Sequence, residues 1–420
     1  MKILILGINF APELTGIGKY TGDLAAFLAA GGHEVRAVTA PPYYPYWRIL
    51  PGYSSFTYKK EEWRGVRVFR VPLWVPRNPS GLTRLIHLAS FAVSSLPPVL
   101  LQALWKPEVV FAIAPAFFSA PAALLAARLA GAKAWLHVQD FELDAALALG
   151  MLPENGAINK FSHLLEGWVL RGFDRVSTIS VSMRDRLLEK KVPLEKTVLL
   201  PNWVDAEAIR PLQGPNLLSS ELGLPSDTIK VLYSGNMGAK QGLEILVDAA
   251  RLLGEREDIQ FILCGEGAAR SGLERRANGL PNLNFLPLQP LERLNELLNL
   301  ADIHVLPQRA GAADLVMPSK LTGMLASGRP VIASADHDTE VGRLVGQVGR
   351  LVPPEDPGAL ASAIVELATD RRERERLGAG GRKYVETNWS REKIMGRVEE
   401  GLDQLIFENT SMRKAHNSLS

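Results

Sequence analysis

Short apolar runs alternate along the chain with longer segments in which apolar residues recur every three or four positions. The short runs are typical of strands buried on both faces of a parallel sheet, and the longer segments are typical of amphipathic helices. In the first half the pattern predicts strands at 2–8, 34–39, 66–71, 109–113, 133–138, 175–179 and 197–200. In the second half it predicts strands at 230–234, 260–264, 283–286, 303–306, 329–333 and 349–352.

The two series of strands, with helices between them, predict two doubly wound α/β domains built on Rossmann-like sheets. A length of 420 residues agrees, because a single core rarely serves more than about 250–300 residues. The proline- and glycine-containing segment 201–224 is the expected hinge. We expect an N-terminal domain at 1–205, a C-terminal domain at 206–390, a final helix at 391–409 that packs back toward the N-terminal domain, and a disordered tail at 410–420.

The composition is ordinary for a globular protein, with 47% hydrophobic and 22% charged residues. One cysteine, Cys264, excludes a disulfide framework and a cysteine-based zinc site, and it fits a reducing compartment. The start MKILILGINF is interrupted by Gly7 and Asn9, which favours a buried first strand over a signal peptide. No uninterrupted apolar run approaches about 18 residues, so we expect a cytoplasmic protein without a membrane span.

Positive charge is concentrated near the N-terminus. Residues 1–139 hold 14 Lys and Arg against 6 Asp and Glu, a balance of +8, whereas the whole chain carries +2. Most of the excess lies among aromatic residues between Arg36 and Arg84, a pattern that fits nucleic acid, an anionic bilayer or a solvated loop. Nucleic acid is disfavoured, since no recognised binding motif accompanies the charge. The candidates for an acceptor or membrane contact are Arg64, Arg67, Arg84 and Trp74.

Glycine-rich segments follow three of the expected strands. They are Asn9–Gly18, with Gly16 and Gly18; Tyr233–Gly238, with Gly235 and Asn236 and followed by Lys240 and Gln241; and Cys264–Gly267, with Glu266. Ligands of open α/β sheets bind beyond the carboxyl ends of the strands, where glycine lets the backbone approach them closely. None of the three matches the dinucleotide fingerprint, so a dehydrogenase is disfavoured. Together they predict a phosphorylated ligand.

A further candidate site lies in the segment DLVMPSKLTGMLASGRPVIAS at 314–334. It predicts a helix that begins at Pro318 and Ser319, where free backbone N–H groups and the helix dipole suit a phosphate. A positive charge such as Lys320 in the first turn is unfavourable beside the positive end of the helix dipole, unless a bound anion compensates it. We therefore expect an anion at this helix start.

Acidic residues follow the strand at 133–138. Asp140 and Glu142, close to His137, are candidates to bind sugar hydroxyls, to act as a base or to ligate a metal, while helix capping by Asp140 is the structural alternative. The segment Asp336-His337-Asp338 is also compatible with a metal, but such turns are common and we favour a turn. No metal site is expected.

Several motifs resemble glycosyltransferase family 4, which has the GT-B fold. They include the segments TGIG, GGHEV, PNWVD and GRPVI, and more narrowly SGNMGAKQGLE, HVQDFELDA and DLVMPSKLTGMLASGRPVI, which look like the colanic-acid and fucosamine glycosyltransferases of bacterial surface-polysaccharide assembly. The resemblance implies two domains facing across a cleft, a nucleotide-sugar donor in the C-terminal domain and an acceptor in the N-terminal one. It also implies a retaining reaction without a metal or other cofactor, and a lipid-linked oligosaccharide acceptor at the inner-membrane surface. The implied sugar is fucose or N-acetylfucosamine.

The chain departs from the family pattern around the donor. Gly323 stands where the family has a ribose-binding glutamate, and Asp314 lies one residue from the place of a second glutamate. Asn236 and Gln241 occupy the places of the arginine and lysine that bind the diphosphate. We expect Lys240 and Lys320 to supply the positive charge instead, with Lys320, Asp140 and Glu142 as catalytic candidates. A nucleotide-sugar epimerase of the same fold and a non-catalytic donor-binding scaffold remain alternatives.

Overall fold

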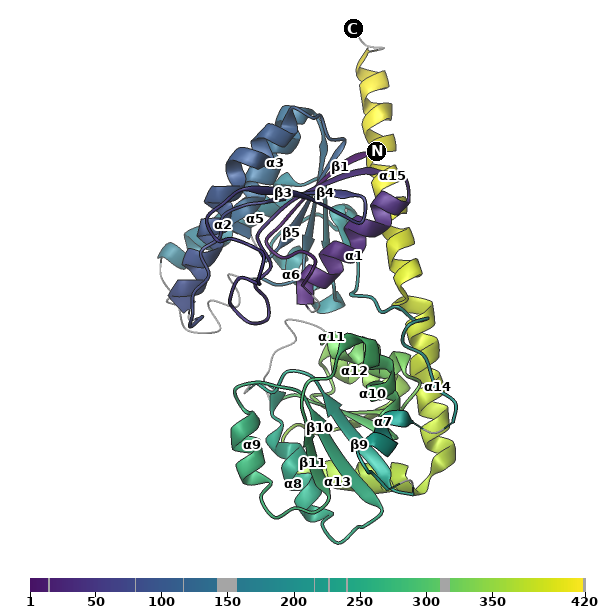
Figure 1. The fold of residues 1–420 in the computed structure, drawn as a ribbon. Coiled ribbons are helices and arrows are strands. Elements are labelled where there is room, and N and C mark those ends of the chain that lie inside the picture. Colours follow the sequence, from purple (N-terminus) through teal and green to yellow (C-terminus); the bar gives the residue numbers. More distant parts are fainter. Residues whose placement is uncertain are drawn as a thin grey trace. The chain divides into compact units, whose positions relative to one another are not determined.

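The chain folds into two compact units, seen here in a computed structural model (Figure 1). The structure describes residues 1–13, 16–79, 81–115, 117–141, 157–214, 216–225, 227–238, 241–309 and 318–417, with Phe117, 157–163 and 408–417 described as backbone alone. One unit comprises Met1–Pro201 and Met395–Ser420, and the other comprises Asn202–Ile394. The division falls four residues before the boundary expected between 205 and 206.

The N-terminal unit is built on an eight-stranded sheet with the order β3-β4-β2-β1-β5-β6-β7-β8. All neighbouring strands are parallel except β3 and β4. The strands are β1 (Lys2–Gly7), β2 (Glu34–Thr39), β3 (Lys59–Trp63), β4 (Val66–Arg70), β5 (Val109–Ala114), β6 (Lys133–Val138), β7 (Arg175–Thr178) and β8 (Thr197–Leu199). The sequence pattern did not predict β3, because this edge strand is charged and lies mostly exposed, as edge strands often do.

Helices cover both faces of this sheet. They are α1 (Gly16–Ala30), α2 (Gly81–Ala103), α3 (Ala120–Ala130), α5 (Ala157–Gly172), α6 (Val181–Glu189) and α15 (Arg391–Asn417), with short turns η1 (Phe117–Ser119) and η2 (Leu194–Lys196). Side chains from α2, α3, α5 and α6 share one core cluster with the sheet, which places these four helices on one face. On the other face, α15 touches Trp135 through Gly401, whose carbonyl accepts a hydrogen bond from Arg175 Nη1 at 3.0 Å.

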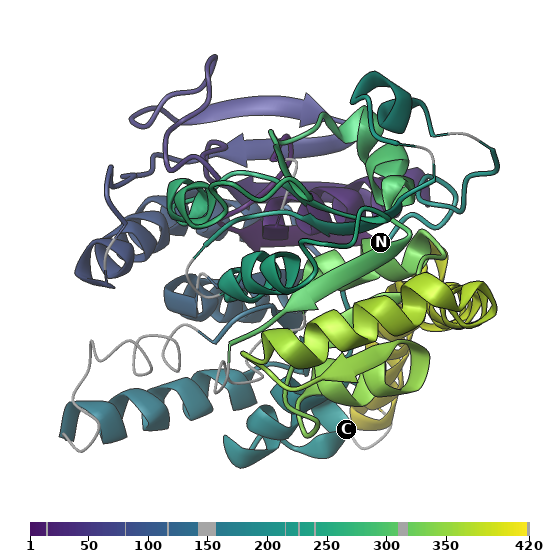
Figure 2. The same cartoon turned by 90° about the horizontal axis from the view of Figure 1, so that it is seen from below.

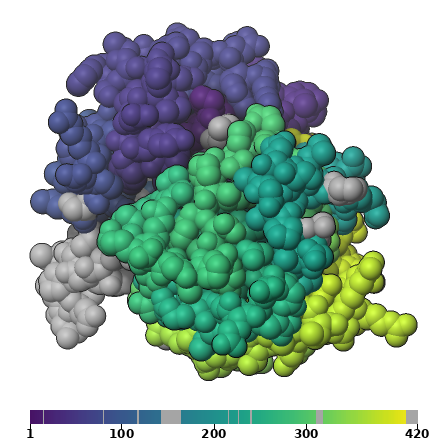
Figure 3. All heavy atoms as spheres, turned by 60° about the horizontal axis from the view of Figure 1, so that its bottom comes forward, coloured from purple at the N-terminus to yellow at the C-terminus, as the bar shows by residue number. Residues whose placement is uncertain are grey.

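The C-terminal unit has a six-stranded, fully parallel sheet with the order β11-β10-β9-β12-β13-β14. Its strands are β9 (Ile229–Ser234), β10 (Ile259–Cys264), β11 (Leu283–Leu286), β12 (Ile303–Pro307), β13 (Val331–Ser334) and β14 (Arg350–Val352). Separate core clusters form around α8 and α13 and around α7, α10 and α11, so helices cover both faces (Figure 2). In the space-filling view, the teal to green atoms of this unit pack into one continuous body (Figure 3). The predicted pair of doubly wound α/β folds is confirmed.

The helices of the C-terminal unit are α7 (Leu217–Glu221), α8 (Glu244–Leu252), α9 (Arg270–Arg276), η4 (Leu291–Arg293), α10 (Leu294–Leu300), α11 (Ser319–Ala326), α12 (Glu340–Val348), α13 (Pro357–Thr369) and α14 (Arg371–Asn388). The segment expected as a hinge is attached to this unit from Val204, whose N–H donates to Trp389 O at 3.0 Å. Arg382 on α14 holds it further by donating to the carbonyls of Ala206 and Ile209.

The end of the chain differs from its prediction. A disordered tail was expected at 410–420, but α15 continues as a helix to Asn417. Residues from Met395 onward belong to the N-terminal unit. The continuation is understandable because the segment contains the strong helix formers methionine, arginine, lysine and alanine, and no glycine or proline.

Candidate functional site

Lys320 lies at the start of α11, at the carboxyl edge of the C-terminal sheet. Pro318 precedes the helix and provides no side-chain cap, so the first-turn N–H groups are not satisfied by a capping side chain. The Lys320 ammonium donates to the Tyr233 hydroxyl and to Asn236 O, at 3.3 Å from the latter, and lies 4.4 Å from the centre of the Tyr233 ring. Burial lowers the pKa of Lys320 to about 8. A cation is thus held at the helix end that prefers an anion.

Tyr233 fixes this lysine from the end of β9. Its hydroxyl donates to Asn236 O at 2.6 Å while accepting from Lys320, and burial raises the pKa of this phenol, which keeps it neutral. The sequence analysis did not identify Tyr233 as a site residue. Its partner Lys320 lies 87 positions away, so no local pattern signals the contact.

The loops after β9 and β10 contain glycines because their neighbours pack too closely to leave room for a Cβ. Gly235 has φ of +134°, and a Cβ there would lie 2.5 Å from Lys320 Cε. Gly265 and Gly267 also have positive φ, and a Cβ on either would collide with the backbone of the first loop. The two loops are joined by backbone bonds, among them Met237 N–H to Glu266 O at 2.8 Å. These glycines therefore allow the loops and the lysine to lie together.

The other residues of this unit that were predicted to bind the nucleotide-sugar donor do not share one environment. Gln241 Oε1 accepts from Gly238 N at 3.1 Å and so closes the loop after β9 rather than projecting from it. Gly323 lies in α11, where a Cβ would meet Leu298 Cδ1 at 3.3 Å, so a side chain here would point toward α10. Ser319 is exposed in the first turn of α11. Lys240 and Asp314 lie outside the described residues.

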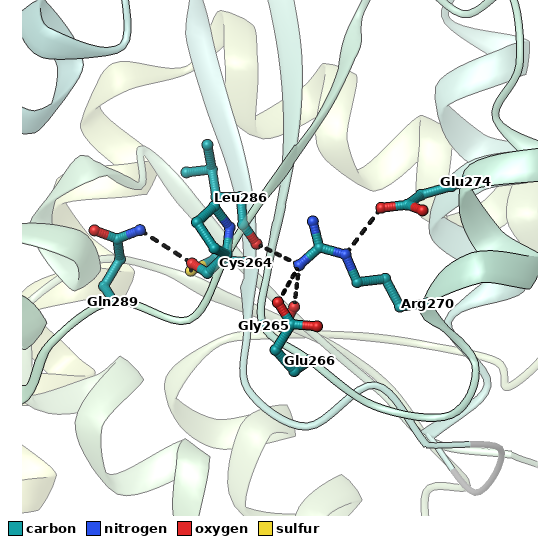
Figure 4. A network of polar contacts seen from close by, with 8 residues as sticks. Cys264, Gly265, Glu266, Arg270, Glu274, Leu286 and Gln289 are labelled. Carbon is teal, nitrogen blue, oxygen red and sulfur yellow. Dashed lines mark hydrogen bonds and ion pairs between the residues drawn. The ribbon is translucent and has the colours of Figure 1, made fainter.

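Glu266 forms part of a network centred on Arg270, which sequence reasoning missed (Figure 4). Arg270 Nη1 donates to Glu266 Oε1 at 2.7 Å, to Gly265 O at 2.7 Å and to Leu286 O at 3.1 Å, while Nε donates to Glu274 at 2.9 Å. The arginine thereby ties the loop after β10 to the end of β11. Its spacing of four residues from Glu274 on α9 was the available signal, because such pairs meet on a helix.

Gly16 and Gly18 belong to the N-terminal unit, and their surroundings reveal another missed residue, Glu13. The Glu13 carboxylate accepts from Asn9 Nδ2 at 2.9 Å and from the N–H groups of Tyr43 and Tyr44, each at 3.0 Å. A Cβ on Gly18 would collide with this carboxylate, whose pKa is raised by burial. Gly16 has φ of +65° and faces the Tyr44 ring. Both glycines thus permit packing of the loops after β1 and β2.

The acidic segment after β6 is only partly described. His137 is buried, its Nδ1 lies 2.9 Å from Ser177 Oγ, and burial lowers its pKa to about 4, so the ring is neutral and structural. Asp140 follows the carboxyl end of β6 and is partly exposed, and Glu142 lies outside the described residues. Over the described ranges, no group of three or more His, Cys, Asp or Glu side chains gathers as metal ligands would. Asp336 lies in the turn before α12, where its carbonyl accepts from Thr339.

The four acceptor or membrane candidates do not form one cluster. Arg64 lies in the turn between β3 and β4, and Arg67 at the start of β4 has Glu34 at 4.0 Å. Trp74 lies past the other end of β4, and Arg84 lies over the Trp47 ring at 5.4 Å. The candidates therefore divide into pairs at opposite ends of one strand.

Helix α2 qualifies the expectation that no segment can span a membrane. Among the described helices, it alone is long and apolar enough to cross a bilayer by length and composition, with a mean hydropathy of 1.4. Only 28% of its most apolar window is buried. The expectation was based on uninterrupted apolar runs. That criterion does not detect α2, because Thr83, Arg84, His87 and several serines interrupt its apolar sequence.

Two family profiles match most of the chain. The glycosyl transferase 4-like domain matches residues 15–203, and the domain described as glycosyl transferases group 1 matches residues 228–370. A putative colanic acid biosynthesis glycosyl transferase of Escherichia coli K12 is 44% identical over 373 residues, which cover 87% of this chain and 91% of the relative. A probable glycosyltransferase of Pseudomonas aeruginosa is 25% identical, covering 62% of this chain and 65% of that protein.

Solved structures share the architecture at low identity. A sucrose-phosphate synthase from Thermosynechococcus elongatus has a TM-score of 0.75 and 20% identity, covering 97% of this chain and 99% of its own. HepE of Anabaena, solved in complex with UDP-glucose, has a TM-score of 0.67 and 16% identity, covering 96% of this chain and all of its own. At these identities the likeness concerns the fold.

Proposed function

Because the chain belongs to the group 1 glycosyltransferases, enzymes of the GT-B fold, we propose that it transfers a sugar from a nucleotide-sugar donor to a lipid-linked oligosaccharide in surface-polysaccharide biosynthesis. The reaction retains the anomeric configuration and uses no metal. The donor sugar is fucose or N-acetylfucosamine. The Lys320 ammonium at the start of α11 is the observation that carries the proposal.

The donor diphosphate binds at the start of α11. Negative charge builds on this diphosphate as the bond to the sugar breaks, and fixed donors at that position stabilise the transition state. The first-turn N–H groups and the Lys320 ammonium are such donors. The HepE complexes with UDP and UDP-glucose support a nucleotide-sugar ligand for this architecture.

The acceptor binds to the N-terminal unit. The carboxylates of Asp140 and Glu142 orient its hydroxyl groups, and the departing phosphate receives the proton of the attacking hydroxyl, so no separate nucleophile is needed. A lipid-linked acceptor is held at the cytoplasmic surface of the inner membrane, and the protein attaches there peripherally. The similarity to a colanic acid biosynthesis enzyme supports an acceptor of this class.

A donor panel tests the proposal. The purified protein is incubated with nucleotide sugars, with and without a lipid-linked acceptor, and both the nucleoside diphosphate and the sugar product are measured. Release that depends on the acceptor, with product of the donor's anomeric configuration, is expected. Isomerised donor without acceptor would instead identify an epimerase, and binding without turnover would identify a scaffold. Product of inverted configuration would refute the retaining reaction.

A further inference from the structure

Helix α2 is apolar on the side that faces away from the sheet. The stripe that packs into the N-terminal unit is mixed, with the polar side chains His87, Ser95 and Gln102 beside Phe91 and Val99. The outward stripe is apolar and contains Leu82, Ile86, Ala89, Val93, Leu96, Pro97 and Leu101. Leu82 is 69% exposed and Val93 is 73% exposed. The outward stripe of a surface helix is normally polar, so this exposed apolar stripe indicates that water is not its natural contact.

The next two helices repeat the outward apolar stripe. The segment leading into α3, and α3 itself, expose Phe118, Leu125 and Leu129. Among its described side chains, α5 exposes Leu164, Leu165 and Trp168, the last at 58%. The exposed positions recur at spacings of three and four residues, as one side of a helix does.

The three stripes lie side by side. Helices α2, α3 and α5 connect β4 to β5, β5 to β6 and β6 to β7, three steps in one direction along the sheet. Right-handed crossovers therefore put them on one face, and α3 packs against both α2 and α5. Figure 1 shows the three on the same side of the sheet. Together they make one broad apolar surface, called here the three-helix face.

The charges of the three-helix face have one sign. The stripes of α3 and α5 each include a single exposed arginine, Arg128 and Arg171. Helices α2 and α3 contain no carboxylate, and the one described on α5, Glu166, is buried with Lys190 Nζ at 2.6 Å. A surface that is broadly apolar, with arginines and without exposed acids among its described side chains, complements an anionic lipid surface.

We propose that the three-helix face lies flat on an anionic phospholipid bilayer. Phe91 and Val99 remain packed in the core, so α2 stays on the sheet and presents only its outer stripe rather than spanning the membrane. This inference rests on the membrane attachment in the proposed function and deepens it. It assigns the contact to three helices of the unit that binds the acceptor, and it excludes the Arg64 and Arg67 edge at the amino end of β4.

Vesicle flotation tests this assignment. The full chain is mixed with vesicles of phosphatidylcholine containing phosphatidylglycerol, or of phosphatidylcholine alone, and the bound fraction is measured. Wild-type protein should bind the anionic vesicles, and the double variant Val93→Glu with Trp168→Glu should bind at least about tenfold more weakly. Arg128→Ala should lose about fivefold. The matched controls Leu252→Glu, an exposed leucine on α8, and Arg64→Ala should bind like wild type.

Further measurements keep the test decisive. Circular dichroism melting of each variant verifies the fold, and release of nucleoside diphosphate with a short soluble acceptor should be unchanged, which separates loss of docking from loss of transfer. Lipids brominated in the acyl chains should quench wild-type tryptophan fluorescence more than that of Trp168→Phe. Equal vesicle binding by wild type and the double variant, or no binding by wild type, would overturn the proposal. So would a wild-type dimer that Val93→Glu dissociates in the absence of lipid, since the face would then join two copies of the chain.

Discussion

Raising the pH from 7 to 9 should weaken nucleoside diphosphate binding through one side chain, Lys320. Burial lowers the pKa of this ammonium to about 8 from an ordinary value of 10.5. It is therefore roughly nine-tenths protonated at pH 7 and roughly one-tenth protonated at pH 9. Only the charged form attracts the anion, and the apparent affinity falls with the fraction of competent protein. The dissociation constant should thus rise about tenfold over this range.

Isothermal titration at pH 7, 8 and 9 measures this effect. The phosphates of the ligand have a second pKa of about 6 and stay ionised over this range. Tyr233 remains neutral because burial raises its pKa. Lys320→Arg should bind with little dependence on pH, since a guanidinium does not lose its proton here. Lys383→Ala, an exposed lysine on α14, should behave like wild type. A wild-type dissociation constant that stays flat, or an equal rise in Lys320→Arg, would refute the reasoning.

Three substitutions extend the account. Lys320→Ala should lower turnover about 10²–10³-fold with an unchanged melting temperature, and normal turnover by the folded variant would remove the lysine from the mechanism. Gly235→Ala should lower both the melting temperature and donor affinity, because its Cβ would meet Lys320 Cε at 2.5 Å. Wild-type donor affinity in this variant would show that the position of Lys320 tolerates the methyl group. Glu13→Gln should lower the free energy of unfolding by about 1–3 kcal/mol, measured in urea, by disturbing two buried hydrogen bonds and one partly buried one; an unchanged midpoint would contradict this.

Local patterns were sufficient to predict most of the strands and the start of α11. Apolar runs located the central strands because strands buried on both faces must be apolar, and Pro318-Ser319 located α11 through its start signal. The edge strand β3 was missed because it is charged and mostly exposed. Glycines were recognised as special, but the sequence could not distinguish approach to a ligand from packing against Lys320, as at Gly235.

The partners of the site residues could not be predicted. Lys320 contacts Tyr233, and Glu13 contacts Tyr43 and Tyr44, across 87 and about 30 positions of chain, so only the fold brings them together. The four acceptor or membrane candidates were chosen by charge and aromatic content, which carry no information about which end of β4 each occupies. The outward apolar stripe of α2 required the structure as well, because periodicity alone does not say which side of a helix faces the sheet.

A crystal structure of the protein with a bound nucleoside diphosphate tests the central claim most directly. The account predicts phosphate oxygens at the start of α11, with one within about 3 Å of Lys320 Nζ and others accepting from first-turn N–H groups. The ammonium should then turn from the Tyr233 hydroxyl toward the phosphate. A diphosphate bound elsewhere, with Lys320 still donating to Tyr233 and Asn236, would contradict the account.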